Sequence, residues 1–123
     1  MAETCEKDEI KTIVYEVLYR FLKEWCWNKN DFEDFNKITD ECSFSEDLGF
    51  DLLDKIELTM DCEGALVGFR YGGDETIGHE VVLEGIYIDD DAVMKAETVG
   101  DFVEVVRNSV LKSAKKIANQ IFG

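Results

Sequence analysis

Apolar side chains recur every three or four residues near both ends of the chain, and this spacing constrains the fold more than any other feature. The first repeat covers four turns and consists of Ile10, Ile13, Val14, Val17, Leu18, Phe21, Leu22 and Trp25. The second consists of Val99, Phe102, Val103, Val106, Val110, Ile117 and Ile121. A repeat of this kind places the apolar side chains on one face of an α-helix. We therefore predict helices over residues 7–27 and 99–120, each with one buried face.

A further helix is predicted in the middle of the chain. Asp51 is a residue type that favours the N-cap position, and apolar residues follow it at helical spacing. The helix should extend from about residue 51 to residue 63, with Gly64 as its stop. The polar residues 28–40 predict a long loop, or a short helix followed by a loop.

The remaining segments predict a short helix and a glycine-rich insertion. Residues 89–95 favour a short helix, and Thr98 and Asp101 have the spacing of a capping box at the start of the last helix. In residues 65–83, two apolar runs flank the sequence Gly-Gly-Asp-Glu at positions 72–75. This pattern is typical of a β-hairpin, and a glycine-rich loop is the alternative.

The size and the residue types are those of one globular domain. A chain of 123 residues with 46% hydrophobic residues is long enough for one modest core. No apolar run has the length of a membrane span, and the N-terminus lacks the basic and apolar pattern of a signal peptide, so we expect a cytoplasmic protein. The four cysteines form no C-x-x-C pair, so we expect reduced thiols and no metal site.

The charge of the chain excludes some partners. There are 28 acidic residues against 13 Lys and Arg, which gives a net charge of −15. Nucleic acid would be repelled, and enzymes with basic surface patches are favoured as partners. The charge is uneven, because the segment from Arg107 to Gly123 contains four basic residues and no acidic residue.

The residues from Asp47 to Asp54 resemble a known motif. They read D-L-G-F-D-L-L-D, and the acyl carrier protein family has D-L-G-x-D-S-L-D at this place. The likeness continues in ITDECSF before the motif, in KIELTM after it, and in IYIDDDAVMKAETVGDFVEVV further along the chain. The resemblance implies an all-α, antiparallel helical bundle of three main helices and one short helix. The β-hairpin or loop would then be an insertion after the second helix.

Leu52 departs from this motif at the functional position. In acyl carrier proteins a serine stands here, and its hydroxyl carries the phosphopantetheine arm that holds acyl groups as thioesters. Leucine has no nucleophilic atom, so we expect no phosphopantetheine on this chain. Ser43, Ser45 and Thr59 are nearby, but none has the motif position at the start of the helix.

The resemblance also implies a partner-binding surface on the second helix. Acidic positions of the family's helix meet basic residues of partner enzymes, and apolar positions make contacts beside them. The matching residues here are Asp51, Leu53, Asp54, Ile56, Glu57, Met60, Asp61 and Glu63. An ordinary solvated acidic face is the alternative. Exposed charges would mainly steer association, and the apolar residues would hold the complex.

Two segments are longer than the corresponding parts of acyl carrier proteins. Each either carries a function or is an extension without one. They are the insertion at residues 65–83 and the basic C-terminal extension at residues 109–123. We expect a non-enzymatic interaction protein that docks on enzymes of fatty-acid, polyketide or related acyl metabolism. The alternative is a working carrier that holds acyl groups non-covalently or through an unexpected residue. His79 has no nucleophile that can be assigned to it, so we predict no catalytic residue.

Overall fold

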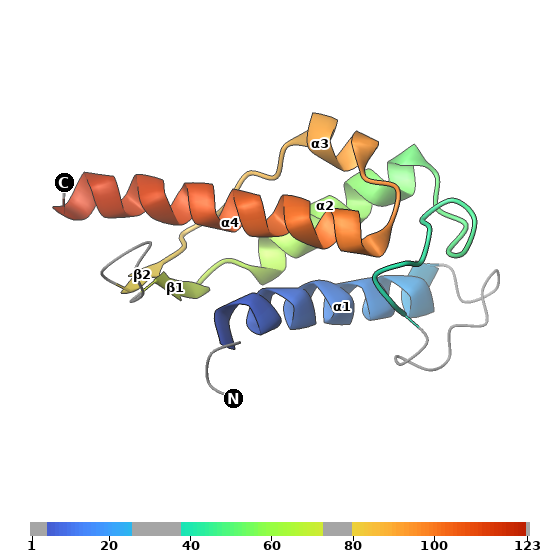
Figure 1. The fold of residues 1–123 in the computed structure, drawn as a ribbon, viewed down its shortest axis with the longest axis horizontal. Coiled ribbons are helices and arrows are strands. Elements are labelled where there is room, and N and C mark those ends of the chain that lie inside the picture. Colours follow the sequence, from blue (N-terminus) through green and yellow to red (C-terminus); the bar gives the residue numbers. More distant parts are fainter. Residues whose placement is uncertain (1–4, 26–37, 73–79, 123) are drawn as a thin grey trace.

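The computed structural model describes residues 5–25, 38–72 and 80–122 as a helical protein with one small sheet (Figure 1). The helices are α1 (Cys5–Trp25), α2 (Leu52–Ala65), α3 (Asp90–Lys95) and α4 (Val99–Phe122). The strands are β1 (Arg70–Gly72) and β2 (Glu80–Val82). Within these residues, the prediction of three main helices and one short helix is confirmed. Most of the predicted loop at residues 28–40 and the single histidine, His79, lie outside the described residues.

The three long helices form the body of the molecule. α1 runs opposite to α2 and α4, and α3 lies against both α2 and α4 (Figure 1). The apolar stripe of α1 is buried at Ile10, Val14, Leu18 and Phe21. Val99, Phe102, Val106 and Val110 of α4 are buried as well, so the helical spacing of the sequence correctly identified both core faces.

Aromatic side chains fill the core between α1, α4 and the segment that leads into α2. The Phe50 ring lies 5.2 Å from that of Phe21 and 5.6 Å from that of Phe44, measured between ring centroids. Phe44 meets Phe102 of α4 edge-on at 5.8 Å. Tilted and edge-on pairs at these distances add to the stabilisation that burial of the rings provides. Phe44 and Phe50 thereby anchor the segment that precedes α2.

Backbone hydrogen bonds fix the same segment to the start of α4. Phe44 N donates to Glu97 O at 2.9 Å, and Val99 N donates to Cys42 O at 2.9 Å. Gly49, three residues before the first residue of α2, has a φ of 72°, a left-handed conformation that favours glycine. The position at which the chain enters α2 is therefore held from two sides.

The glycine-rich insertion forms an antiparallel pair of strands rather than a loop alone. Tyr71 pairs with Val81, and the strands pack against α4. Val81 and Leu83 are buried in the common core. Of the two alternatives for this segment, the hairpin is confirmed, with residues 73–79 between its strands outside the described residues.

The predicted end of the second helix is wrong by two residues. α2 continues through Gly64 to Ala65, and Leu66 is its C-cap with φ −94° and ψ 0°. The left-handed glycine occurs later, at Gly68, with φ 86°. Leu66 is completely buried, so packing of this residue holds the final turn beyond the glycine.

Candidate functional site

The candidate site begins at the N-terminus of α2, where two carboxylates close a capping box. Asp54 N donates to Asp51 Oδ1 at 2.9 Å, and Asp51 N donates to Asp54 Oδ2 at 3.2 Å. Asp51 has an extended backbone, as expected of an N-cap residue. The sequence predicted Asp51 as the cap, but it did not predict that Asp54 completes the box. Both carboxylates therefore stabilise the helix start as well as contributing negative charge there.

Leu52 is the first residue of α2, and its side chain is half exposed at 50%. Its neighbour Leu53 is 64% exposed. The position at which the motif expects a serine is thus open to solvent but offers only a hydrocarbon side chain. Exposure of two adjacent leucines to water is unfavourable in free energy, and it gives this end of the molecule an apolar surface.

The outer face of α2 combines apolar and acidic side chains. Leu53, Glu57 and Met60 follow one another at helical spacing on the side opposite to the buried residues Leu58 and Cys62. Met60 is 62% exposed and Glu57 is partly exposed. Ile56 is partly buried beside this stripe, and Asp61 is exposed on its other side. The structure therefore brings most of the predicted partner-binding residues onto one accessible surface, which we call the α2 outer face.

Glu63 differs from the other predicted docking residues because its carboxylate is used inside the molecule. Glu63 Oε2 accepts a hydrogen bond from Ile88 N at 2.8 Å, and the bond is partly buried. Ile88 is fully buried in the segment that leads to α3. The sequence contains no local signal for this bond, because the two residues lie 25 positions apart. Glu63 joins α2 to the α3 connection.

Lys55 is a second residue whose role the sequence pattern did not indicate. Its Nζ donates to Ala96 O at 2.7 Å and to Met94 O at 3.3 Å, both at the C-terminal end of α3. The ammonium group also lies 5.7 Å from the centre of the Phe44 ring. These contacts hold α3 beside the first half of α2. They also place Met94, which is 50% exposed, on the neighbouring surface.

The hydroxyl groups near Leu52 offer no equivalent attachment point. Thr59 is buried, and its Oγ1 donates to Lys55 O at 2.8 Å within α2. Ser43 Oγ accepts from Glu46 N at 3.2 Å in the turn before the helix. Ser45 is exposed in the same turn, several residues before the motif position. None of the three begins a helix, so each differs from the motif serine in its local backbone.

The two thiols whose surroundings the structure describes differ in exposure. Cys62 is fully buried in the core, and burial raises the pKa of its thiol well above the usual value. Cys42 is partly exposed in the loop before α2. Across residues 5–25, 38–72 and 80–122, no group of three or more His, Cys, Asp and Glu side chains has the geometry to hold a metal ion.

Comparisons with protein-family models, with curated proteins and with solved structures found no match to this chain. The resemblance to acyl carrier proteins therefore depends on the sequence motif and its surroundings. In the part of the chain that the structure describes, no helix combines the length and the apolar character needed to cross a membrane.

Proposed function

We propose that this chain is an acyl-carrier-like interaction protein that is not pantetheinylated and that docks on enzymes of acyl metabolism through α2. The observation that carries the proposal is the start of α2. There, a capped acidic helix presents Leu52 and Leu53 to solvent at the motif position. The resemblance also implies three long helices and one short helix, and this number and order support the proposal.

The α2 outer face has the two components that such docking needs. Leu53 and Met60 are exposed apolar side chains that a partner could cover, and burial of such residues provides most of the binding free energy at interfaces. The acidic residues around them would guide a basic partner during association. The docking enzyme would belong to fatty-acid, polyketide or related acyl metabolism, and its surface would be basic around an apolar patch.

The missing nucleophile is tested by mass spectrometry after incubation with coenzyme A and a broad-specificity phosphopantetheinyl transferase. We expect no change in the mass of the parent chain and the gain of one phosphopantetheine in Leu52→Ser. A gain of mass by the parent would show that another residue is modified. If Leu52→Ser stays unmodified while remaining folded, the start of α2 is not a carrier-type site.

Docking is tested by quantitative affinity capture with matched variants, followed by binding measurements on the purified captured protein. Leu53→Ala and Met60→Ala should each weaken binding by about 1 kcal/mol or more. Val67→Ala is the control, because Val67 is 57% exposed but lies outside α2. Glu57→Lys should mainly slow association, and this effect should be smaller at high salt. Equal binding by all four variants would exclude α2 as the docking surface.

A further inference from the structure

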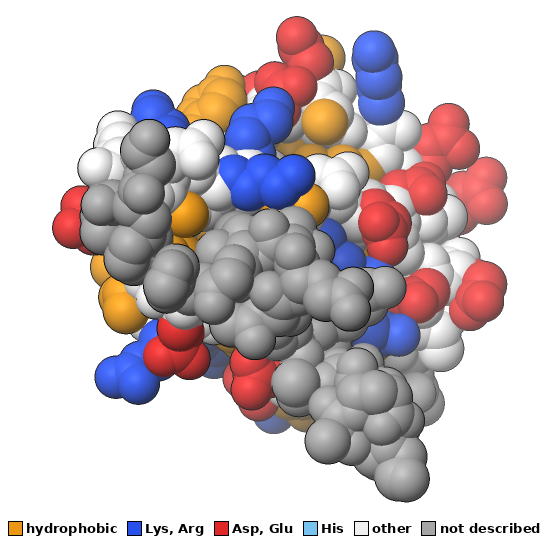
Figure 2. All heavy atoms as spheres, turned by 60° about the vertical axis from the view of Figure 1, so that its left-hand side comes forward, with side chains coloured by type: hydrophobic (Ala, Val, Ile, Leu, Met, Phe, Trp, Pro, Cys, Tyr) orange, Lys and Arg blue, Asp and Glu red, His pale blue; other side chains and the backbone are white. Residues whose placement is uncertain are grey.

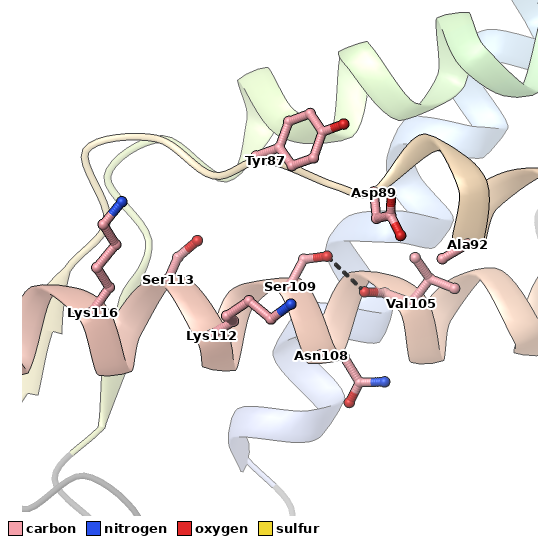
Figure 3. A pocket seen from close by; sticks show the side chains of 9 residues that line it. All are labelled: Tyr87, Asp89, Ala92, Val105, Asn108, Ser109, Lys112, Ser113 and Lys116. Atoms are coloured by element: carbon pink, nitrogen blue, oxygen red, sulfur yellow. Dashed lines mark hydrogen bonds between the residues drawn. The ribbon is translucent and has the colours of Figure 1, made fainter.

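A concave site lies along the middle of α4, away from the start of α2. It is a groove of about 400 Å³ between α4 and the segment that connects β2 to α3. Figure 3 shows Tyr87 of that segment on one side of the groove and Ser109 and Ser113 of α4 on the other. A volume of this size is within the range of small-molecule sites, which is about 300–1,000 Å³.

One part of the groove offers a flat apolar surface beside hydroxyl groups. The Tyr87 side chain is 70% exposed, although aromatic rings usually gain from burial. Val105 and Ala92 also line the groove. Ser109 Oγ donates to Val105 O at 2.9 Å, so its oxygen is left to accept a hydrogen bond rather than to donate one. A flat ligand could therefore lie against Tyr87 and α4.

The other part of the groove is positively charged. Lys112 and Lys116 both line it, and their spacing of four residues places them on one face of α4. Within the described part of the chain, neither ammonium group lies within ion-pair distance of a carboxylate. Such a pair of lysines is unusual in a chain with 28 acidic and 13 basic residues.

The charges along the groove also give it a direction. Asp89 lines the end opposite to Lys116 (Figure 3). Its carboxylate accepts a hydrogen bond from Asp91 N at 3.3 Å. An anion would be repelled at that end and attracted towards Lys112 in the middle of the groove and Lys116 at its other end (Figure 3). Figure 2 shows Lys and Arg side chains gathered in the upper middle of one face of the molecule and acidic side chains along its right-hand edge. Local attraction at the lysines must therefore overcome the general repulsion by a net charge of −15.

We propose that this groove binds a small phosphate monoester with a flat apolar body. The exposed side chains of Lys112 and Lys116 would turn towards the phosphate between them, because lysine ammonium groups bind phosphate as point charges. The apolar body would lie against Tyr87, with its far end towards Asp89. This site is separate from the α2 outer face, so binding here does not depend on the proposed docking function.

Phenyl phosphate is a suitable probe because it has only the two features that the groove should recognise. We expect saturable binding at one site, measured by calorimetry, with amide NMR shifts concentrated in Tyr87 and in α4 around Lys112. Inorganic phosphate lacks the ring and phenol lacks the charge, so each should bind at least about tenfold more weakly. Absence of saturable binding by phenyl phosphate, or shifts centred elsewhere on the chain, would overturn the proposal.

Matched variants distinguish the groove from general attraction of an anion to surface lysines. Lys112→Gln combined with Lys116→Gln should weaken phenyl phosphate binding by at least about tenfold. Lys95→Gln combined with Lys115→Gln changes the net charge equally, but neither residue lines the groove, so binding should change by less than about twofold. Equal losses in the two double variants would overturn the proposal.

The role of the ring is tested by Tyr87→Ala, which should remain folded because the side chain is so exposed. This variant should weaken phenyl phosphate binding by about fivefold and leave the weak binding of inorganic phosphate unchanged. Circular dichroism and thermal unfolding of each variant confirm that the fold is intact. Unchanged binding of phenyl phosphate by Tyr87→Ala would show that the ring of the ligand does not lie against Tyr87.

Discussion

Asp40 joins three parts of the chain that are distant in sequence. Its carboxylate accepts hydrogen bonds from the Tyr15 hydroxyl and, at 3.1 Å, from Lys11 Nζ of α1. Its backbone oxygen accepts from Gly100 N at the start of α4, at 2.9 Å. The bond from Tyr15 is the largest cause that keeps the pKa of the Asp40 carboxyl below its usual value, and Lys11 contributes in the same direction.

Tyr15→Phe should therefore destabilise the fold in a pH-dependent way. Loss of the hydroxyl removes the hydrogen bond to Asp40 and should lower the free energy of unfolding at pH 7. The loss should be only about 1 kcal/mol, because solvent screens this partly exposed site. A carboxyl whose folded pKa is lowered stabilises the fold above its unfolded pKa of about 4, and this contribution is lost as the pH falls through the folded value. Urea unfolding of parent and variant at pH 7, 5 and 3 should show a difference that shrinks at pH 3. A difference independent of pH would contradict this assignment.

Replacement of two helical glycines by alanine should have effects of opposite sign. A Cβ at Gly100 would lie 3.0 Å from Asp40 Cβ and 3.2 Å from Asp40 O, and the bonds just described hold Asp40 in place. A Cβ at Gly64 in α2 would meet no atom within 4 Å. We expect Gly64→Ala to raise the free energy of unfolding by up to about 1 kcal/mol through helix propensity, and Gly100→Ala to lower it. Thermal unfolding measures both, and stabilisation by Gly100→Ala would show that Asp40 moves freely.

At the scale of single residues, local signals were predictable and distant pairings were not. The cap at Asp51 and the Thr98 and Asp101 capping box follow from neighbouring residues, and both are confirmed. The Asp40 and Glu63 bonds join residues 25 positions or more apart. The spacing of residues along the chain does not predict such pairs, because the residues meet only when the helices pack.

At the scale of elements, α3 has only six residues and depends on its neighbours for stability. Lys55→Met removes the two hydrogen bonds from α2 to the end of α3 and should lower the free energy of unfolding by about 1 kcal/mol. Lys95→Met is the control, because Lys95 is an exposed residue of α3 and the change in charge is the same. Hydrogen exchange should become faster in α3 in the Lys55 variant and stay near the parent rate in the control. Equal exchange in both variants would show that Lys55 does not hold α3.

The helices were more predictable than the ends and connections of the elements. The apolar stripes of α1 and α4 gave their buried faces, because helical spacing is a property of the sequence itself. Gly64 was a misleading stop signal, since burial of Leu66 outweighs the propensity cost of one glycine. The sequence left the hairpin and the loop as equal alternatives. The structure distinguishes them through Val81 and Leu83, which find buried positions beside α4.

At the scale of the whole molecule, the net charge of −15 should oppose folding through self-repulsion. An increase in NaCl from about 0.01 M to about 1 M shortens the screening length from about 30 Å to about 3 Å. We expect Tm to rise by several degrees over the first part of this range, as for a gain of about 1 kcal/mol. Choline chloride at the same ionic strength controls for specific effects of sodium. A Tm that falls with both salts would show that attractive ion pairs dominate.

The groove on α4 was not predictable as a site, although its lysines were visible in the sequence. The basic extension at residues 109–123 indicated an unusual charge, but not what lies opposite to it. The side of the groove opposite to α4 is formed by Tyr87, which the fold places there. A ligand site of this kind exists only when two segments meet, and for that reason it becomes visible at the level of the whole molecule.

The insertion between α2 and α3 begins and ends at nearly the same place. Gly68 N donates to Leu83 O at 2.6 Å, and Leu83 N donates to Phe69 O at 2.8 Å, so the two ends of the insertion are already joined by backbone bonds. A segment closed at its base in this way can lengthen or shorten by mutation without moving the helices that it connects. In evolutionary terms, this closure makes the hairpin a place where the chain can acquire new surface while the order of its helices is inherited unchanged.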